Sequence, residues 1–166
     1  MTTHRRRLLG AFVLLPLTAL KTQAQVAASE ASLRETISQY VAAWNRHDVQ
    51  GWANFLTDDI WYTEAIDFYK RFQGLQAVVT SFQDAVKETD LLWDVKRLRI
   101  MPDGTGTVVV KHVAQILPKT DGKYKSSFES DPSISRWRFE GGKWRMFFFT
   151  SHKGTALAEM KKDGVE

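Results

Sequence analysis

The segment YVAAWNRHDVQGWANFLTDDIWYTE, residues 40–64, contains in order the end of one helix, a short second helix and a strand. The first helix has apolar residues at helical spacing, and these are Leu33, Ile37, Tyr40, Val41 and Trp44. Ser32 and Glu35 have the spacing of a capping box at its start. Asp48 can cap the second helix, and a strand is expected at 60–64. The segment therefore predicts a helix–helix–strand unit.

Beyond this unit the hydrophobic pattern is that of one more helix and then of strands. Gly74 precedes a helix whose apolar residues keep the helical spacing as far as Val86. Four strands separated by turn sequences are expected, at residues 91–100, 107–117, 127–139 and 144–152. The tail, residues 154–166, is polar and is expected to be loosely helical. Helices followed by antiparallel strands indicate a single α+β domain.

The first 24 residues have the three-part plan of an export signal. Three arginines at 5–7 precede an apolar run at 8–20, which is too short to cross a bilayer as a helix. The arginine pair fits a twin-arginine signal, although His4 stands where Ser or Thr is usual, so the ordinary secretory route stays open. Cleavage is expected near 24–28. We therefore expect an exported, periplasmic protein that meets the membrane only during export.

The net positive charge of the chain comes from the first 24 residues. The chain has 23 Lys and Arg against 19 Asp and Glu, and four of the basic residues but no acidic residue precede residue 24. The remaining part is therefore balanced, with 19 of each sign, and gives no support for nucleic-acid binding. The chain has no cysteine, which excludes disulfides, and no pair of histidines has metal-ligand spacing. We expect no metal and no cofactor.

The order of these elements resembles the nuclear transport factor 2-like superfamily, most specifically in residues 40–64 and the helix that follows Gly74. The segment SRWRFEGGKWRMFFFTSHKG, residues 135–154, resembles the closing hairpin of SnoaL-like members. The resemblance implies a domain over 29–153 in which a cone-shaped, curved antiparallel sheet wraps around three N-terminal helices. It also implies a homodimer through the outer face of the sheet. Trp137 and Phe139 could contribute to that surface.

Within the superfamily, the closest pattern is that of the ketosteroid isomerases. Their first helix reads Tyr-Val-Ala-Ala-x-Asn, and YVAAWN matches it with Tyr40 in the place of the oxyanion-hole tyrosine. They carry a catalytic acid five residues after the second of two adjacent aspartates, and that spacing from Asp59 selects Glu64. Their third residue is a late-strand aspartate, but Ser135 stands here in the corresponding stretch. An oxyanion hole of Tyr40, alone or with Ser135, would stabilise an enolate less.

The residues themselves support part of this expectation. Ile60, Tyr62 and Glu64 alternate onto one face of the early strand. If that face is internal, burial would raise the pKa of Glu64 and suit it to proton transfer at neutral pH. Tyr40 lies on the apolar face of its helix, where its hydroxyl needs an internal partner. The same pair could also hold a water molecule or a ligand without turnover, and Glu64 could instead be solvated at the strand end.

The other candidates are weaker. His112 alternates with apolar residues and is either a hydrogen-bonded core residue or an auxiliary acid/base. His152 ends the last strand and could line the mouth of the cone, while Asp67 falls in a loop and is expected to be solvated. We expect the pocket to be lined by a set of mainly aromatic residues: Trp44, Trp61, Tyr62, Asp67, Trp93, Phe148 and His152.

Three functions fit these features. The first is a cofactor-free isomerase, dehydratase or cyclase for a small, largely apolar substrate, with Glu64 as base, Tyr40 as oxyanion donor, and His112 or Ser135 as an auxiliary group. The second is a periplasmic binding protein that holds a small apolar or aromatic ligand without reaction. The third is an assembly module whose cone is filled by rings and whose outer face is the functional surface. The sequence leaves the three open.

Overall fold

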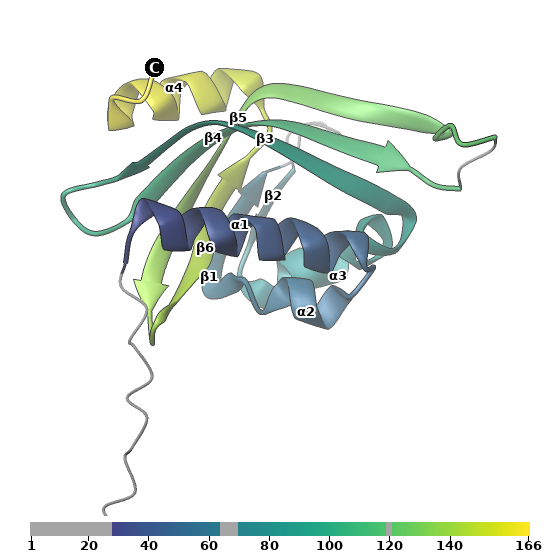
Figure 1. Ribbon diagram of the computed structural model, residues 1–166, viewed down its shortest axis with the longest axis horizontal. Helices are drawn as coiled ribbons and strands as arrows, with labels where there is room; N and C mark the ends of the chain where they lie inside the picture. Colours follow the sequence, from purple (N-terminus) through teal and green to yellow (C-terminus); the bar gives the residue numbers. More distant parts are fainter. Residues whose placement is uncertain (1–27, 64–69, 119–120) are drawn as a thin grey trace, which may run out of the picture.

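The computed structural model describes residues 28–63, 70–118 and 121–166. The first half of the chain has two helices, then two strands and a third helix, and strands dominate the second half (Figure 1). The helices are α1 (Glu30–Asn45), α2 (Val49–Ala53), α3 (Leu75–Glu88) and α4 (Lys153–Asp163). The strands are β1 (Leu56–Thr63), β2 (Arg71–Gln73), β3 (Thr89–Ile100), β4 (Gly106–Ile116), β5 (Ser126–Glu140) and β6 (Lys143–Thr150).

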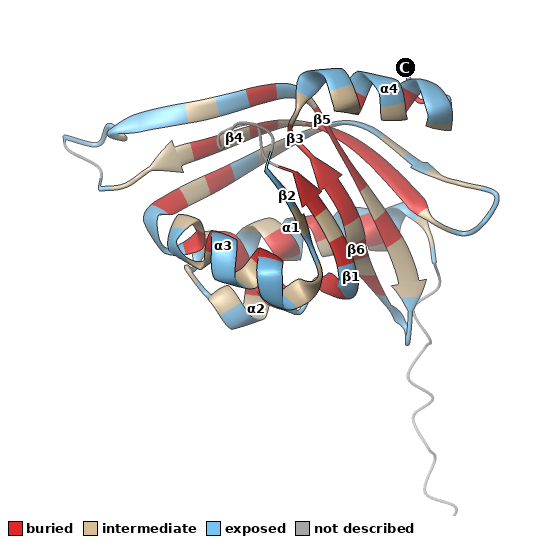
Figure 2. Cartoon of the chain, turned by 180° about the vertical axis from the view of Figure 1, so that it is seen from behind, coloured by how far each residue is buried: buried red, intermediate tan, exposed pale blue. Residues whose placement is uncertain are grey.

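The strands form a six-stranded, curved sheet in the order β2-β1-β6-β5-β4-β3. Each neighbouring pair is antiparallel except β1 and β6, which are parallel. Helices α1, α2 and α3 lie on the concave face, and α4 lies on the opposite, outer face (Figures 1 and 2). The predicted α+β fold, with a curved sheet and N-terminal helices, is confirmed. The sheet is unclosed, and the parallel pairing of β1 with β6 makes it mixed, so the expectation of a wholly antiparallel sheet is wrong.

Helix α1 begins earlier than the sequence pattern predicts. The hydroxyl of Ser29 accepts a hydrogen bond from the amide of Ser32 (3.1 Å), and the hydroxyl of Ser32 accepts one from the amide of Ser29 (3.0 Å). This reciprocal pair is a capping box made of two serines, so Glu35 is not part of it. The predicted box at Ser32 and Glu35 is therefore wrong by one turn. Trp144 on β6 also donates to the Ser32 hydroxyl, which joins the helix start to the sheet.

The main core lies between the concave face of the sheet and the three helices. The stripe predicted for α1 supplies Leu33, Ile37, Tyr40 and Trp44, all nearly inaccessible to solvent. The facing strands contribute Ile60, Tyr62, Leu91, Val108, Val110, Trp137, Trp144, Met146 and Phe149. Burying this much aromatic and aliphatic surface supplies most of the stability of a domain without disulfides.

A bulge in β6 changes which side chains face the core. Trp137 on β5 pairs with Met146, and the preceding Arg136 pairs with Phe148, so Phe147 is an extra residue. Met146 and Phe149 consequently lie in the core, whereas Phe148 packs in the outer cluster. Strict alternation of side chains along β6 predicts that Phe148 faces the core, as Met146 does. The bulge makes this prediction wrong, because it places Phe148 on the outer face of the sheet.

The outer face carries a second, smaller core beneath α4. Its buried members are Val109, Ile134, Phe148, Ala156, Met160 and Val165. Arg136 forms ion pairs with Glu159 and Asp163 of α4, and Arg97 donates to the carbonyl of Val165 (2.7 Å). The predicted polar tail is thus a docked helix. Trp137 and Phe139 pack in or against the main core, so their predicted place on the outer surface is wrong.

Gly74 joins β2 to α3 in a conformation that side chains disfavour, with a φ of 87°. Its amide donates to the carbonyl of Ile60 (2.8 Å), which holds the turn against β1. We expect Gly74→Ala to lower the free energy of unfolding by about 1–3 kcal/mol, because a residue with a Cβ is strained at a positive φ combined with a ψ of 145°. Urea denaturation would measure it, with Ser81→Ala on the exposed face of α3 as control. Equal values for the two variants would contradict the assignment.

In the described part of the chain, none of the helices has both the length and the apolar character required to cross a membrane.

Candidate functional site

Tyr40 lies at the centre of the aromatic interior. Its ring contacts four others, with centroid distances of 4.9 Å to Trp93, 5.8 Å to Trp137, 6.1 Å to Phe55 and 6.5 Å to Trp52. Helix α1 aims Tyr40 at the sheet because it belongs to the apolar stripe of that helix. The prediction that this side chain points inward agrees with the structure.

Trp93 connects this group to the end of the sheet where β6 finishes. It stacks on Phe149 with centroids 5.5 Å apart and an interplanar angle of 10°. Phe149 in turn contacts Tyr62, with ring centroids 4.7 Å apart. Tyr62 therefore lies in the main core, and Trp93 packs against it. We call Tyr40, Tyr62, Trp93, His112 and Phe149 the interior site.

His112 is the buried titratable group of the interior site. Trp93 on the neighbouring strand donates its indole N–H to Nδ1 of His112 (2.8 Å). Because Nδ1 accepts, the neutral ring carries its proton on Nε2. Burial lowers the pKa of His112 from 6.5 to about 4. The side chain is therefore a neutral donor at pH 7, which suits it to polarise a carbonyl oxygen better than to remove a proton.

Ser135 also faces the core, but its hydroxyl has a structural contact. It accepts a hydrogen bond from the indole N–H of Trp137 (2.9 Å), two residues along the same face of β5. Trp137 packs edge-on against Tyr40. Ser135 therefore holds in place the indole ring against which Tyr40 packs. The hydroxyl can still donate one hydrogen bond. A serine there supplies a weaker donor than a protonated carboxylic acid.

Glu64 and Asp67 lie outside the described residues. β1 ends at Thr63, which pairs with Thr150 at the end of β6. Tyr62, which precedes Thr63, faces the interior. Its ring packs on that of Phe82, with centroids 4.6 Å apart, and on that of Phe149. β1 therefore ends beside the interior site. The predicted role of Glu64 rests on the sequence.

The remaining predicted pocket residues lie elsewhere. Trp44 packs edge-on against Trp52 (5.3 Å) and donates to the Thr89 hydroxyl (3.0 Å), which is a structural role within the helical layer. Trp61 stacks on Phe148 on the outer face, with centroids 5.6 Å apart. His152 caps α4 by accepting from the amide of Thr155 (3.3 Å). Trp61, Phe148 and His152 are therefore not in the interior.

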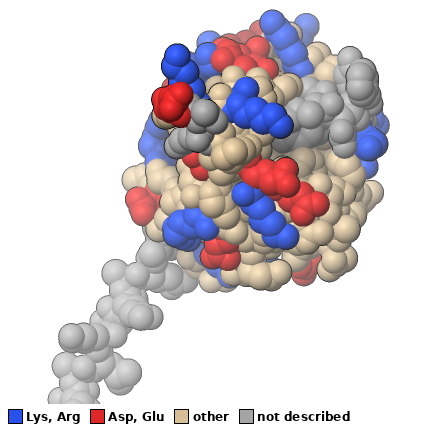
Figure 3. All heavy atoms as spheres, turned by 90° about the vertical axis from the view of Figure 1, so that its right-hand side faces the viewer, with Lys and Arg blue, Asp and Glu red and all other residues tan. Residues whose placement is uncertain are grey.

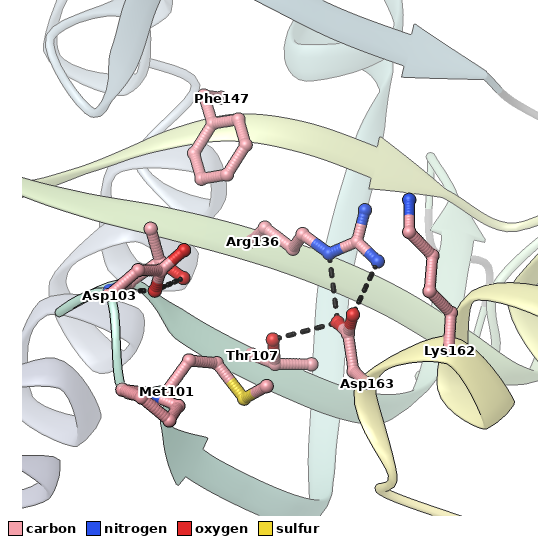
Figure 4. Close-up of a pocket in the computed structure, with 9 residues that line it drawn as sticks. Met101, Asp103, Thr107, Arg136, Phe147, Lys162 and Asp163 are labelled. Atoms are coloured by element: carbon pink, nitrogen blue, oxygen red, sulfur yellow. Dashed lines mark hydrogen bonds and ion pairs between the residues drawn. The ribbon is translucent and has the colours of Figure 1, made fainter.

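The sequence pattern missed the polar cluster that joins β5 to α4. Figure 4 shows Arg136 and Asp163 pointing toward each other, with Thr107 of β4 bound to the same carboxylate. These residues, with Met101, Asp103, Phe147 and Lys162, line a cavity of about 430 Å³ on the outer face. The arginine is already paired with two carboxylates, so this cluster anchors the helix. Its signal in the sequence was only the spacing of Glu159 and Asp163, one helical turn apart.

Other surface features are consistent with these assignments. In the face drawn in Figure 3, basic and acidic side chains are interspersed. Among the residues that the structure describes, no group of three His, Cys, Asp or Glu side chains could hold a metal ion.

Comparison with known proteins identifies the family. The model of a SnoaL-like domain matches residues 37–147. An NTF-2 like protein of unknown function from Shewanella oneidensis MR-1 is similar in structure, with a TM-score of 0.58 and 11% identity, over 72% of this chain and 95% of that chain. A ketosteroid isomerase-like protein from Erwinia carotovora atroseptica SCRI1043 is also similar in structure. Its TM-score is 0.57 and its sequence identity 14%, over 72% of this chain and 92% of that chain.

A further similar structure is an uncharacterized protein with a cystatin-like fold from Caulobacter vibrioides, with a TM-score of 0.58 and 16% identity, over 72% of this chain and 85% of that chain. Identities this low show the fold alone. Comparison with curated proteins found no similar sequence. The family match begins within α1 and ends within β6, so it includes Tyr40 and Phe147. The chain therefore belongs to the SnoaL-like family of the nuclear transport factor 2-like superfamily.

Proposed function

We propose that the interior site binds a small, largely apolar molecule with a carbonyl group and catalyses cofactor-independent proton transfer on it. The observation that supports this most directly is the hydrogen bond from Trp93 to Nδ1 of His112. It holds a buried, neutral imidazole as a donor at Nε2 within the same ring cluster as Tyr40. A neutral donor in a water-poor site can stabilise a developing oxyanion at little reorganisation cost.

The proposed reaction is an isomerisation through an enolate. The substrate class is a β,γ-unsaturated ketone: Glu64 removes a proton from the carbon between the carbonyl and the C=C bond, the C–H electron pair forms a new C=C bond, and the C=O bond becomes the C–O⁻ of a dienolate. Tyr40 and His112 donate hydrogen bonds to that oxygen. Glu64 then returns the same proton to the far carbon of the original C=C bond, the carbonyl re-forms, and the C=C bond is left conjugated with it. The atoms and electrons balance without an oxidant, reductant or co-reactant.

A second candidate is ligand binding without turnover in the same site. Ser135 favours it, because the hydroxyl that stands where the ketosteroid isomerases have an aspartate accepts from Trp137 and is a weaker donor. The ring-to-ring packing around Tyr40 also suits an apolar ligand that is held by contact area. In this case the carbonyl is recognised but no proton moves.

Glu64→Gln separates the two candidates. For the enzyme, we expect turnover of enolisable ketones to fall by at least about 100-fold, because the variant removes the base but keeps shape. Ligand affinity should change little, and Asp67→Asn, which removes a carboxylate three residues away, should keep full activity. Turnover would be followed by the movement of deuterium from the α-carbon to the γ-carbon of labelled β,γ-unsaturated ketones, and binding by calorimetry. Undiminished turnover in Glu64→Gln would contradict the proposal; binding without turnover in the wild type would select the second candidate.

The cellular setting and the oligomer are also proposals. The export signal expected at 1–24 lies outside the described residues, and it supports action in the periplasm. The proposed homodimer would use the outer face of the sheet. Helix α4 already covers part of this face through Ala156 and Met160, so a second copy would have to bind beside it.

A further inference from the structure

A small cavity lies on the outer face, where β1 and β2 meet the beginning of α4. Its volume is about 150 Å³, and it is lined by Trp61, Thr63, Arg71, His152 and Thr155. None of these five residues is acidic. Trp61 and Thr63 alternate with Tyr62, which faces the core, so this outer cavity is separate from the interior site.

The outer cavity carries two sources of positive potential. The guanidinium of Arg71 lies over the ring of Trp61, 5.4 Å from its centroid, and it has no ion-pair partner among the residues that the structure describes. The second source is the N-terminus of α4, to which His152 and Thr155 belong. The amides of Lys153 and Gly154 precede the first bond within that helix, as first-turn amides do.

Thr63 is an independent indication that something polar binds in the outer cavity. The residue is only 5% exposed, and its hydroxyl forms no hydrogen bond with any described residue. The hydroxyl oxygen is not one of the fully buried, unpartnered side-chain atoms, so it reaches the cavity and can donate to a bound acceptor. Thr155 adds a second hydroxyl to the lining, which contacts Nδ1 of His152 (2.7 Å).

We propose that the outer cavity binds the oxyanion group of a small molecule, a carboxylate or a phosphate. Arg71 supplies a planar set of donors that matches either group, and Thr63 donates from the buried end. The positive end of α4 adds to the attraction. Trp61 presents an aromatic surface for the apolar part of the ligand. This site does not depend on the function proposed for the interior.

Titration of the full chain, followed by NMR, tests this site. Sodium acetate and inorganic phosphate would each be added at constant ionic strength, with sodium chloride as the reference anion. We expect saturable shifts of the Gly154 and Thr155 amides and of the Trp61 indole with at least one of the two oxyanions. Saturation by acetate alone assigns a carboxylate site, and saturation by phosphate alone assigns a phosphate site.

Three variants make the result specific. Arg71→Gln should weaken binding by at least about tenfold, since it removes a charge-assisted hydrogen bond. Thr63→Val keeps the shape of the buried side chain and should weaken binding by about threefold to tenfold. Arg46→Gln removes the same charge at the exposed C-cap of α1 and should bind as the wild type does. Shifts that chloride reproduces, or equal affinity in the wild type and Arg71→Gln, would overturn the proposal.

Discussion

Replacing Arg136 with methionine is expected to lower the free energy of unfolding by about 3 kcal/mol and to loosen α4 from the sheet. The side chain of Arg136 is 14% exposed and that of Asp163 only 11%, so the variant leaves a largely buried carboxylate without its counter-charge. Burial alone would lower the pKa of Arg136, but hydrogen bonds with Asp163 and Glu159 outweigh it and raise that pKa. Arg136 therefore keeps its charge beside these two carboxylates.

Arg138→Met is the matched control, because Arg138 lies two residues along the same face of β5. It pairs with Asp59, whose side chain is 58% exposed, and such a pair contributes less than about 1 kcal/mol. Urea denaturation would give both values. Binding of a hydrophobic dye would report exposure of Ile134 and Phe148 when α4 detaches. Equal destabilisation by the two variants would show that Arg136 does not anchor the helix.

The stability of the wild type is expected to fall by about 3 kcal/mol as the pH is lowered from about 6.5 to 4, through His112 alone. The folded state lowers the pKa of His112 to about 4 by burial, against 6.5 in the unfolded chain. Between these values the unfolded chain binds the proton and the folded chain does not, so acid favours unfolding. Above pH 6.5 both states are neutral, and this contribution is fully present.

His112→Asn isolates this contribution from the carboxylates that also titrate in acid. The amide oxygen of asparagine can accept the hydrogen bond of Trp93 near the position of Nδ1, and the side chain does not titrate. We expect the difference in unfolding free energy between wild type and variant to change by about 3 kcal/mol from pH 7 to pH 4. Denaturation curves at four pH values would give it. A difference that stays constant across this range would show that His112 is not buried as a neutral ring.

Local pattern predicted most of the elements of the fold. The apolar residues of α1 and α3 recur at helical spacing, and the glycine-rich turns separate the late strands, so each element is specified by residues close together in sequence. The curvature of the sheet was predicted from the family resemblance. The three-residue β2 and the parallel pairing of β1 with β6 were not predictable in this way. Parallel pairing joins strands that are far apart in the chain and has no turn to mark it.

The interior site was partly predictable for the same reason. Tyr40 belongs to a helical stripe and His112 to an alternating strand, and both face the core as their periodicity predicts. The acceptor role of His112 was not predictable, because it depends on the register that sets Trp93 opposite it. A hydrogen bond between strands is a property of the pairing, not of either strand.

Local periodicity is sufficient to predict the α+β class, the three amphipathic helices and the inward position of Tyr40, because it sets which face of an element is apolar. The side of the sheet on which each aromatic ring lies depends instead on contacts between distant segments. One extra residue at Phe147 places Phe148 outside, and β1 presents Trp61 and Thr63 to the outer cavity. Docking of α4 through Arg136 likewise depends on charges brought together by folding. Bulges, register and long-range ion pairs arise from contacts between distant segments, which a local pattern does not encode.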